Sequence, residues 1–288
     1  MNDSSAFILS SWRSGSTLLQ SLLNAHSRMV GLHELHLPFL ELPEGERSWW
    51  RWRSRPVRRQ VLRLAREALA AHGLRIPDRE LLDPDPRKNR ETFDRISKEV
   101  RSRAGKEILV EKTPGYSLNA PAIDRLFPEG VRKLILVRSP GGVAASCAAT
   151  FPGTFPTIES GLEHWLKYYG ALDAHCRTAR AETILLLRYE ELLDGEAELR
   201  RACAFLGVAF EPEMLRYGER GGRSPLAGKV NWGDPSGKIR TGRIDASNGE
   251  RWRAAAGETV DRWLRDRPEA VRLAESFGYG EPVAAKAR

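Results

Sequence analysis

The chain has 288 residues, 41% hydrophobic and 29% charged, which is enough to bury one substantial core, as a single α/β domain or as two small ones. It contains no apolar stretch near the roughly 20 residues that span a bilayer, and its start lacks a basic segment followed by a long apolar one. Three widely spaced cysteines give neither a disulfide framework nor a metal-ligand spacing, so we expect a protein of the reducing cytoplasm.

The charge balance favours an acidic partner. Lys and Arg number 46 against 38 Asp and Glu, a formal net charge of +8, which suits an anionic ligand, a carrier protein, nucleic acid or a membrane surface. Residues 47–66 interleave arginines with Trp49, Trp50 and Trp52. Such a pattern serves single-stranded nucleic acid or peripheral membrane contact, but an amphipathic helix packed over the core has the same pattern and is more common.

Short apolar runs alternate with helical stretches along the chain. The run Ala6–Ser10 ends in a small-residue loop and is followed by the helix-like sequence TLLQSLLNAH. Three further β-type runs, each preceding a helical stretch, are Ile108–Glu111, Lys133–Val137 and Thr183–Leu187. The helical stretches are residues 121–127, residues 141–149 and the segment that begins Tyr-Glu-Glu-Leu-Leu. This alternation predicts an α/β fold with a mostly parallel central sheet and helices on both faces.

Two segments depart from the alternation. Residues 41–105 are charged, helical in period and poor in strand signal, so we expect a helical insertion over the sheet. Glu219–Asn248 is rich in Gly, Ser, Pro and basic residues and too long for an ordinary connection, which indicates a functional flap or a disordered loop. No linker divides the chain, and we therefore predict one domain over residues 1–288.

The loop after the first strand is a candidate anion site. A strand-to-helix loop presents backbone N–H groups and the positive end of the helix dipole. The loop is Arg13, Ser14, Gly15, Ser16 and Thr17, and it lacks the G-x-x-x-x-G-K-[ST] spacing of nucleotide triphosphatases. ATP or GTP hydrolysis is thereby disfavoured, although a Ser/Gly-rich turn that only caps a helix has the same sequence.

This loop resembles the 5′-phosphosulfate-binding loop of sulfotransferases that use 3′-phosphoadenosine 5′-phosphosulfate (PAPS), whose first basic residue, here Arg13, contacts the phosphate left behind. The sequence KLILVRSPGGVAAS is similar to the family's 3′-phosphate segment and supplies Arg138 at a strand end and Ser146 about two helical turns further on. A guanidinium and a hydroxyl at that spacing suit a phosphate. The resemblance implies a three-layer, P-loop-like fold.

The resemblance extends further along the chain. Leu187–Leu192 resembles the turn whose tyrosine lies near the adenine, here Tyr189, although a tyrosine there fits a packed core equally well. Weaker similarity continues through Arg253 and implies Arg240 as a nucleotide contact. In-line sulfonyl transfer requires no metal in principle, and no metal site is evident in the sequence.

The segment His33–Phe39 supplies the candidate bases, because sulfonyl transfer must deprotonate an acceptor hydroxyl. In an extended segment Glu34 and His36 point to the same side. The E-x-H-x-x-F pattern resembles the glycan and polyketide branches of the family, which makes Glu34 the first candidate base and His36 the second. Structural roles, with Glu34 capping or ion-paired and His36 packed, remain open.

A candidate cation lies in the segment that ends the second predicted run. Val110–Tyr116 is similar to the E-K-[ST]-P segment of glycan sulfotransferases, which implies that Lys112 places a positive charge near the sulfonate or its bridging oxygen. On a strand Glu111 and Lys112 face opposite sides, so we expect only one to face the site. A lysine at a strand end is otherwise most often exposed.

The resemblance implies a sulfotransferase that moves a sulfonyl group from PAPS to an acceptor hydroxyl and releases 3′-phosphoadenosine 5′-phosphate (PAP). The chain is most similar to sulfotransferase domains of polyketide assembly lines, which sulfate a β-hydroxyacyl chain on a carrier protein. Trp12 and the Trp/Arg-rich segment depart from that pattern, so the acceptor is a β-hydroxyacyl carrier protein or another small-molecule alcohol. The alternatives are a nucleotide or small-molecule kinase, which would need the missing Walker lysine, and a non-catalytic protein that binds an anion or, less expected, nucleic acid.

Overall fold

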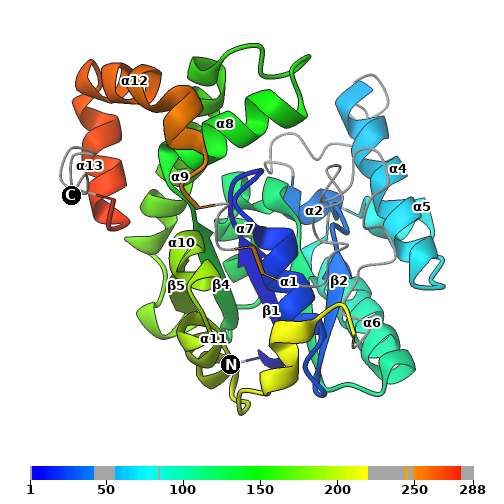
Figure 1. The fold of residues 1–288 in the computed structure, drawn as a ribbon. Helices are drawn as coiled ribbons and strands as arrows, with labels where there is room; N and C mark the ends of the chain where they lie inside the picture. Colours follow the sequence, from blue (N-terminus) through cyan, green and yellow to red (C-terminus); the bar gives the residue numbers. More distant parts are fainter. Residues whose placement is uncertain (1, 42–55, 84, 220–243, 246–248, 280–288) are drawn as a thin grey trace.

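The computed structural model describes residues 2–41, 56–83, 85–219, 244–245 and 249–279 (Figure 1). Its centre is a sheet of five strands in the order β2-β3-β1-β4-β5, in which every pairing is parallel. The strands are β1 (Asn2–Leu9), β2 (Met29–His33), β3 (Ile108–Lys112), β4 (Val131–Val137) and β5 (Ile184–Arg188). The predicted α/β fold with a parallel sheet is confirmed.

The sheet is buried on both faces because its strands are apolar on both sides. In β1, Phe7 and Leu9 belong to one hydrophobic cluster, whereas Ala6 and Ile8 belong to a second cluster on the opposite face. Alternate side chains of a strand point to opposite faces, so a strand without polar positions requires a helical layer on each side. The three layers in Figure 1 follow from this pattern.

Each face is covered by its own helices. Side chains of α1, α10 and α11 fill the cluster that contains Ile8, and those of α4, α6, α7 and α9 fill the cluster that contains Phe7. The first half of the chain supplies α1 (Ser16–Asn24), α2 (Pro38–Glu41), α4 (Pro56–Ala71), α5 (Asp78–Leu81), α6 (Pro86–Ala104), the 3₁₀ helix η2 (Pro114–Asn119) and α7 (Pro121–Leu126). The second half supplies α8 (Pro140–Thr150), α9 (Ile158–Cys176), η3 (Ala181–Thr183), α10 (Tyr189–Leu193), α11 (Ala197–Leu206), η4 (Pro212–Arg216), α12 (Trp252–Arg265) and α13 (Pro268–Ser276).

The segment expected to be a helical insertion carries α4, α5 and α6. In α4, Val61 and Ala65 are buried against the core while Arg63 and Arg66 are exposed, an amphipathic arrangement. Residues 47–55, which hold the tryptophans of the Trp/Arg-rich segment, lie outside the described residues, as does most of the predicted flap. The flap and the membrane contact therefore stay predictions.

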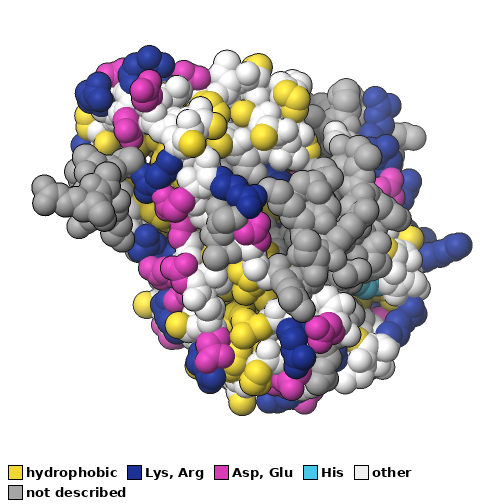
Figure 2. Space-filling model, in the orientation of Figure 1, with side chains coloured by type: hydrophobic (Ala, Val, Ile, Leu, Met, Phe, Trp, Pro, Cys, Tyr) yellow, Lys and Arg dark blue, Asp and Glu magenta, His cyan; other side chains and the backbone are white. Residues whose placement is uncertain are grey.

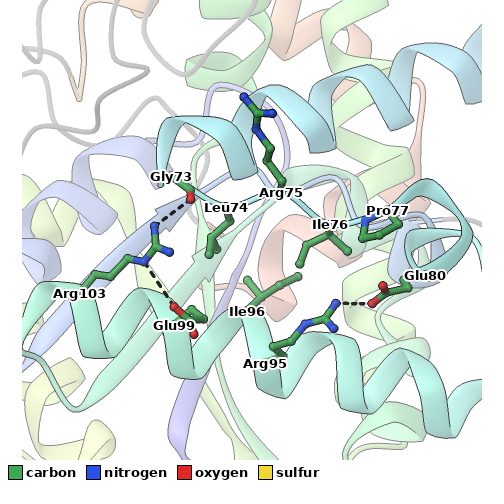
Figure 3. A pocket seen from close by; sticks show the side chains of 10 residues that line it. All are labelled: Gly73, Leu74, Arg75, Ile76, Pro77, Glu80, Arg95, Ile96, Glu99 and Arg103. Carbon is green, nitrogen blue, oxygen red and sulfur yellow. Dashed lines mark hydrogen bonds and ion pairs between the residues drawn. The ribbon is translucent and has the colours of Figure 1, made fainter.

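The surface of the described residues has a pocket away from the predicted site residues and a mixed distribution of charges. A pocket of about 320 Å³ lies between the α4–α5 connection and α6, with Leu74, Ile76 and Ile96 on its apolar side, and it contains no residue predicted for the site (Figure 3). On the face drawn in Figure 2, described Lys and Arg side chains are interspersed with Asp and Glu. None of the helices in the described part of the chain has the length and hydropathy needed to cross a membrane.

Candidate active site

The predicted anion loop joins the end of β1 to the start of α1. Gly15 is the N-cap of α1, with φ 87° and ψ 11°, and no side chain caps the helix there. The first N–H groups of a helix have no partner within the helix, so this end presents donors to an anion. Ser14 differs from its neighbours, because its hydroxyl is buried against Tyr169 OH at 2.6 Å. Only the backbone of Ser14 remains for a ligand.

The absence of a side chain at Gly15 lets the loop backbone approach the Tyr189 ring closely. A Cβ atom at this position would overlap the ring of Tyr189, and the positive φ is one that L side chains rarely adopt. The loop therefore passes directly over the Tyr189 ring. This close approach fits the backbone-lined anion site that the sequence predicts.

Four predicted nucleotide-binding residues meet beside this loop. Arg13 Nε donates to Ser146 Oγ at 3.1 Å, and the Arg138 guanidinium donates to the Arg13 carbonyl at 2.9 Å. The Arg138 guanidinium also lies over the Tyr189 ring, 4.4 Å from its centroid. The structure thus brings together residues from the β1–α1 loop, the end of β4, α8 and α10.

Arg138 is held at the end of β4 by the aromatic face of α9. Its backbone N–H donates to Tyr169 OH at 3.2 Å, and its carbonyl accepts a hydrogen bond from Trp165 Nε1 at 2.9 Å. Helix α8 then begins at Pro140, with the Ser139 side chain as its cap. Strand end, guanidinium and helix start are therefore positioned by buried groups.

The second cluster joins Glu34, His36 and Lys112. Lys112 ends β3, is 1% exposed and forms an ion pair with Glu34. His36 bridges two carboxylates, with Nε2 3.4 Å from Glu34 Oε2 and Nδ1 3.0 Å from Glu41 Oε2. Lys112 therefore differs from most strand-end lysines, which are exposed to solvent. Glu34 thus contacts both His36 and Lys112, which joins the three residues predicted for acid–base and charge roles.

The backbone is not extended at Glu34 and His36, the condition under which the sequence placed both side chains on one side. Their φ angles are 40° and 46°, in the left-handed region, and together with Arg13 (63°) they are the non-glycine residues with positive φ in the described part of the chain. All three were predicted as catalytic from the sequence. Such backbone conformations persist where the surroundings enforce them, and they concentrate at functional sites.

The charges of this cluster follow from burial and ion pairing. Burial alone lowers the pKa of His36, but the carboxylates of Glu41 and Glu34 outweigh burial and raise that pKa to about 10. The imidazole is therefore protonated at neutral pH. Burial raises the pKa of Glu111 to about 7, against hydrogen bonds from Thr113 and Leu35 that lower it. Sequence reasoning assigned no role to Glu41 or Glu111.

The two clusters lie in line along the carboxyl edge of the sheet. Glu34 follows β2, Lys112 ends β3, Arg13 follows β1 and Arg138 follows β4, which is the order of the strands in the sheet. Ligands of open parallel sheets bind at this edge. The Ser10 backbone and the Ser117 hydroxyl exchange two hydrogen bonds of 2.9 Å, which join the end of β1 to η2.

Trp12 packs into an aromatic group next to the anion loop. Its ring is 38% exposed and packs at 5.4–6.1 Å between centroids against Phe151, Phe155 and His164. Burial and the negative charge of Glu41 raise the pKa of Tyr168, whereas a hydrogen bond with Trp12 lowers it. Tyr168 packs against His164, with 4.3 Å between ring centroids, and so belongs to the same aromatic group.

One predicted contact, Arg240, lies outside the described residues. Among the residues that the structure describes, no group of three or more His, Cys, Asp or Glu side chains is arranged to hold a metal ion.

Comparison with known proteins identifies the family. The model of the sulfotransferase family matches residues 5–212, and the chain belongs to that family of enzymes. A search of curated protein sequences gave no match. The family assignment agrees with the resemblance drawn from the loop and the strand-end arginine, and it defines the chain as a PAPS-dependent sulfotransferase.

Two solved structures share the fold over nearly the whole chain. The sulfotransferase domain from the curacin biosynthetic pathway is 21% identical with a TM-score of 0.66, covering 96% of this chain and 98% of that domain. The sulfotransferase domain from the Synechococcus PCC 7002 olefin synthase is 22% identical with a TM-score of 0.64, covering 96% and 95%.

Proposed function

We propose that this enzyme transfers the sulfonyl group of PAPS to a hydroxyl of an acceptor bound between the Glu34 cluster and the Arg13 loop. The observation that carries the proposal is the alignment of both clusters along one sheet edge. Anion-binding groups lie at the β1 and β4 ends, and a carboxylate with two cationic partners lies at the β2 and β3 ends. Sulfonyl transfer needs both sets of groups side by side.

The nucleotide end would hold three parts of PAPS. Arg138 and Ser146 suit the 3′-phosphate, because guanidinium and hydroxyl groups both donate to phosphate oxygens. Arg13 and the N-terminal N–H groups of α1 suit the 5′-phosphate, on which negative charge develops during transfer. Tyr189, whose ring lies beneath the Arg138 guanidinium, is the proposed neighbour of the adenine. Arg13 and Arg138 bring two positively charged side chains to the same end of the sheet, which favours an anionic ligand there.

At the reacting end, Glu34 would take the proton of the acceptor hydroxyl. The acceptor oxygen attacks sulfur in line, and the bond between sulfur and the bridging oxygen breaks, leaving its electron pair on the 5′-phosphate of PAP. Lys112 is buried and paired with Glu34, so its ammonium group can stabilise negative charge that develops on the transferring sulfonyl group. With Glu34 as the base and Lys112 as its electrostatic partner, the transfer requires no reactant other than PAPS and the acceptor.

His36 is the weaker candidate base because it already carries a proton. A histidine whose pKa is raised to about 10 must first lose that proton before it can accept one from the substrate. Between Glu34 and Glu41 it is placed to orient the Glu34 carboxylate. We therefore assign the base role to Glu34 and the orienting role to His36.

For the acceptor, we favour a β-hydroxyacyl chain on a carrier protein or another alcohol with an apolar body. Two structures that share the fold are sulfotransferase domains of the curacin pathway and of an olefin synthase. The exposed Trp12 side chain, next to Arg13 in the chain, supplies an apolar surface for such a body. The formal charge of +8 also favours an acidic partner.

The decisive test is a transfer assay. The protein is incubated with PAPS and with β-hydroxyacyl carrier proteins, phenols, glycolipids and simple sugars, and release of PAP and sulfation of each acceptor are followed by mass spectrometry. With at least one acceptor class, we expect one molecule of PAP to be released for each acceptor molecule that is sulfated. Turnover of ATP with phosphorylation of an acceptor would instead support a kinase, and tight PAP binding without transfer would support a non-catalytic binding protein.

A further inference from the structure

The turn that carries Glu34 and His36 is tied to one neighbouring segment through its backbone. Four consecutive N–H groups of this turn donate to acceptors in residues 111–116, three of them side chains. The bonds are Glu34 N to Lys112 O (2.8 Å), Leu35 N to Glu111 Oε1 (3.1 Å), His36 N to Thr113 Oγ1 (3.3 Å) and Leu37 N to Tyr116 OH (2.8 Å). The first of these bonds continues the parallel β2–β3 ladder past His33, and the next three replace backbone acceptors by side chains.

We infer that Glu111, Thr113 and Tyr116 form a clamp that positions Glu34 for proton transfer. The inference rests on the proposed role of Glu34 as the base. The clamp touches the backbone of the turn and neither reacting group, so its members are positioning residues. Each acts on a different N–H group, and together they fix where the Glu34 carboxylate and the His36 imidazole project.

The turn needs such a clamp because its backbone is strained. A non-glycine residue in the left-handed region costs about 1–2 kcal/mol, and this turn contains two of them separated by one residue. A strained conformation persists only where its surroundings determine it. Leu35 and Leu37 are fully buried in the core, which anchors the turn from below, and the clamp fixes the polar side.

Glu111 is an unusual choice for a purely structural acceptor. It is fully buried, and its Oε2 has no hydrogen-bond partner among the described residues. Its Oε1 accepts from both Leu35 N and the Thr113 hydroxyl, at 3.1 and 2.6 Å. Burying a carboxylate costs free energy that a neutral acceptor or an apolar residue avoids. Glu111 contacts the backbone of the Glu34–His36 turn directly at Leu35 and also contacts Thr113, whose hydroxyl holds the turn at His36.

Substitutions can separate positioning from stability. Glu111→Gln keeps a carbonyl oxygen for Leu35 N, whereas Glu111→Ala removes the acceptor. Tyr116→Phe removes only the hydroxyl that receives Leu37 N. Tyr217→Phe serves as the matched control, because Tyr217 is equally buried but belongs to the cluster on the opposite face of the sheet.

The test measures kcat, the KM of the acceptor, PAP affinity and Tm for each variant. We expect Glu111→Ala and Tyr116→Phe to lower kcat about 10- to 100-fold with PAP affinity within about twofold, and Glu111→Gln to recover most of the rate. Tyr217→Phe should leave kcat unchanged. If Glu111→Ala does not fold, Tyr116→Phe carries the same test.

A double substitution gives the sharpest outcome. If the clamp acts through Glu34, Tyr116→Phe should cost little further rate in a Glu34→Gln background, because the group it positions is already gone. An equal fractional loss in both backgrounds, or a lowered Tm with unchanged kcat, would overturn the clamp. Absence of sulfonyl transfer in the unsubstituted enzyme would instead overturn the proposed function.

Discussion

The Arg13 side chain donates from Nε to the Ser146 hydroxyl across 3.1 Å, which joins the β1–α1 loop to helix α8. The Arg138 guanidinium adds a second link through the Arg13 carbonyl. The groups proposed for the 5′- and 3′-phosphates are therefore in direct contact with each other. A substitution at the proposed 3′-phosphate site should therefore also alter the position of Arg13 at the proposed 5′-phosphate site.

Arg138→Ala should weaken PAP binding by about 2–5 kcal/mol, because it removes a partly buried charge partner of the 3′-phosphate. Ser146→Ala should cost less, since a neutral hydrogen bond contributes about 0.5–1.5 kcal/mol. Titration calorimetry with PAP and AMP measures both effects. Arg177→Ala, an exposed arginine that pairs with Asp173 on α9, is the control. Equal affinity of the unsubstituted protein for PAP and AMP would contradict the assignment.

Glu34→Gln should lower turnover by about 10²- to 10⁴-fold while PAP affinity stays nearly unchanged, because the substitution keeps the size and removes the proton acceptor. His36→Ala should cost less, through a less well oriented carboxylate. Steady-state rates at saturating acceptor decide between the two residues. Near-normal turnover in Glu34→Gln would remove Glu34 from the mechanism.

The raised pKa of His36 also predicts a pH-dependent contribution to folding. Protonated His36 is stabilised by Glu41 and Glu34, so its contribution is fully present below about pH 6.5 and is lost as the pH rises through about 10. The difference in unfolding free energy between the protein and His36→Gln should therefore shrink from pH 6.5 to 10. Urea unfolding across that range measures it, and a constant difference would show that His36 is neutral in the fold.

Gly15→Ala should destabilise the protein and weaken PAP binding, because the new methyl group would overlap the Tyr189 ring as well as strain the backbone. Gly105→Ala is a matched control, since Gly105 also has a positive φ, 63°, but no atom lies within 4 Å of its added Cβ. Backbone strain alone costs about 1–2 kcal/mol. Calorimetric unfolding should show a larger loss for Gly15→Ala, and equal losses would place the ring elsewhere.

Trp12→Ala should raise the KM for an acceptor with an apolar body several-fold and leave PAP affinity unchanged, because the exposed indole face is proposed to contact the acceptor. Leu118 is also 38% exposed, so Leu118→Ala controls for the loss of exposed apolar surface. Parallel changes in both variants would show that Trp12 has no specific role in acceptor binding.

The sequence predicted the parts of the fold that rest on continuous apolar runs. Strands β1, β3, β4 and β5 each contain a continuous apolar run, and those of β3 and β4 are almost entirely buried, so their composition alone distinguishes them. Strand β2 escaped prediction because Gly31 interrupts its apolar residues. Its strand conformation depends on pairing with β3, which no local pattern reveals.

The candidate site divides in the same way. Arg13, Arg138 and Ser146 were predicted from the resemblance of their segments to the phosphate-binding segments of sulfotransferases, and the structure brings them together. The conformation of Glu34 and His36 was not predictable, because their positive φ angles are imposed by side chains about 80 residues away. Contacts between distant segments, such as Glu111 with the backbone of Leu35, leave no periodic signal in either segment.

The central place of β1 in the sheet also governs when the protein can form during synthesis. Ser5 pairs with Leu109 and Ala6 with Arg132, so the first strand finds both neighbours only after more than 100 further residues have been made. Closing such long loops is slow, and unpaired apolar strands aggregate. A nascent chain that stops before β4 contains the Arg13 loop but neither Arg138 nor Ser146, and we expect it to depend on chaperones and to bind no nucleotide.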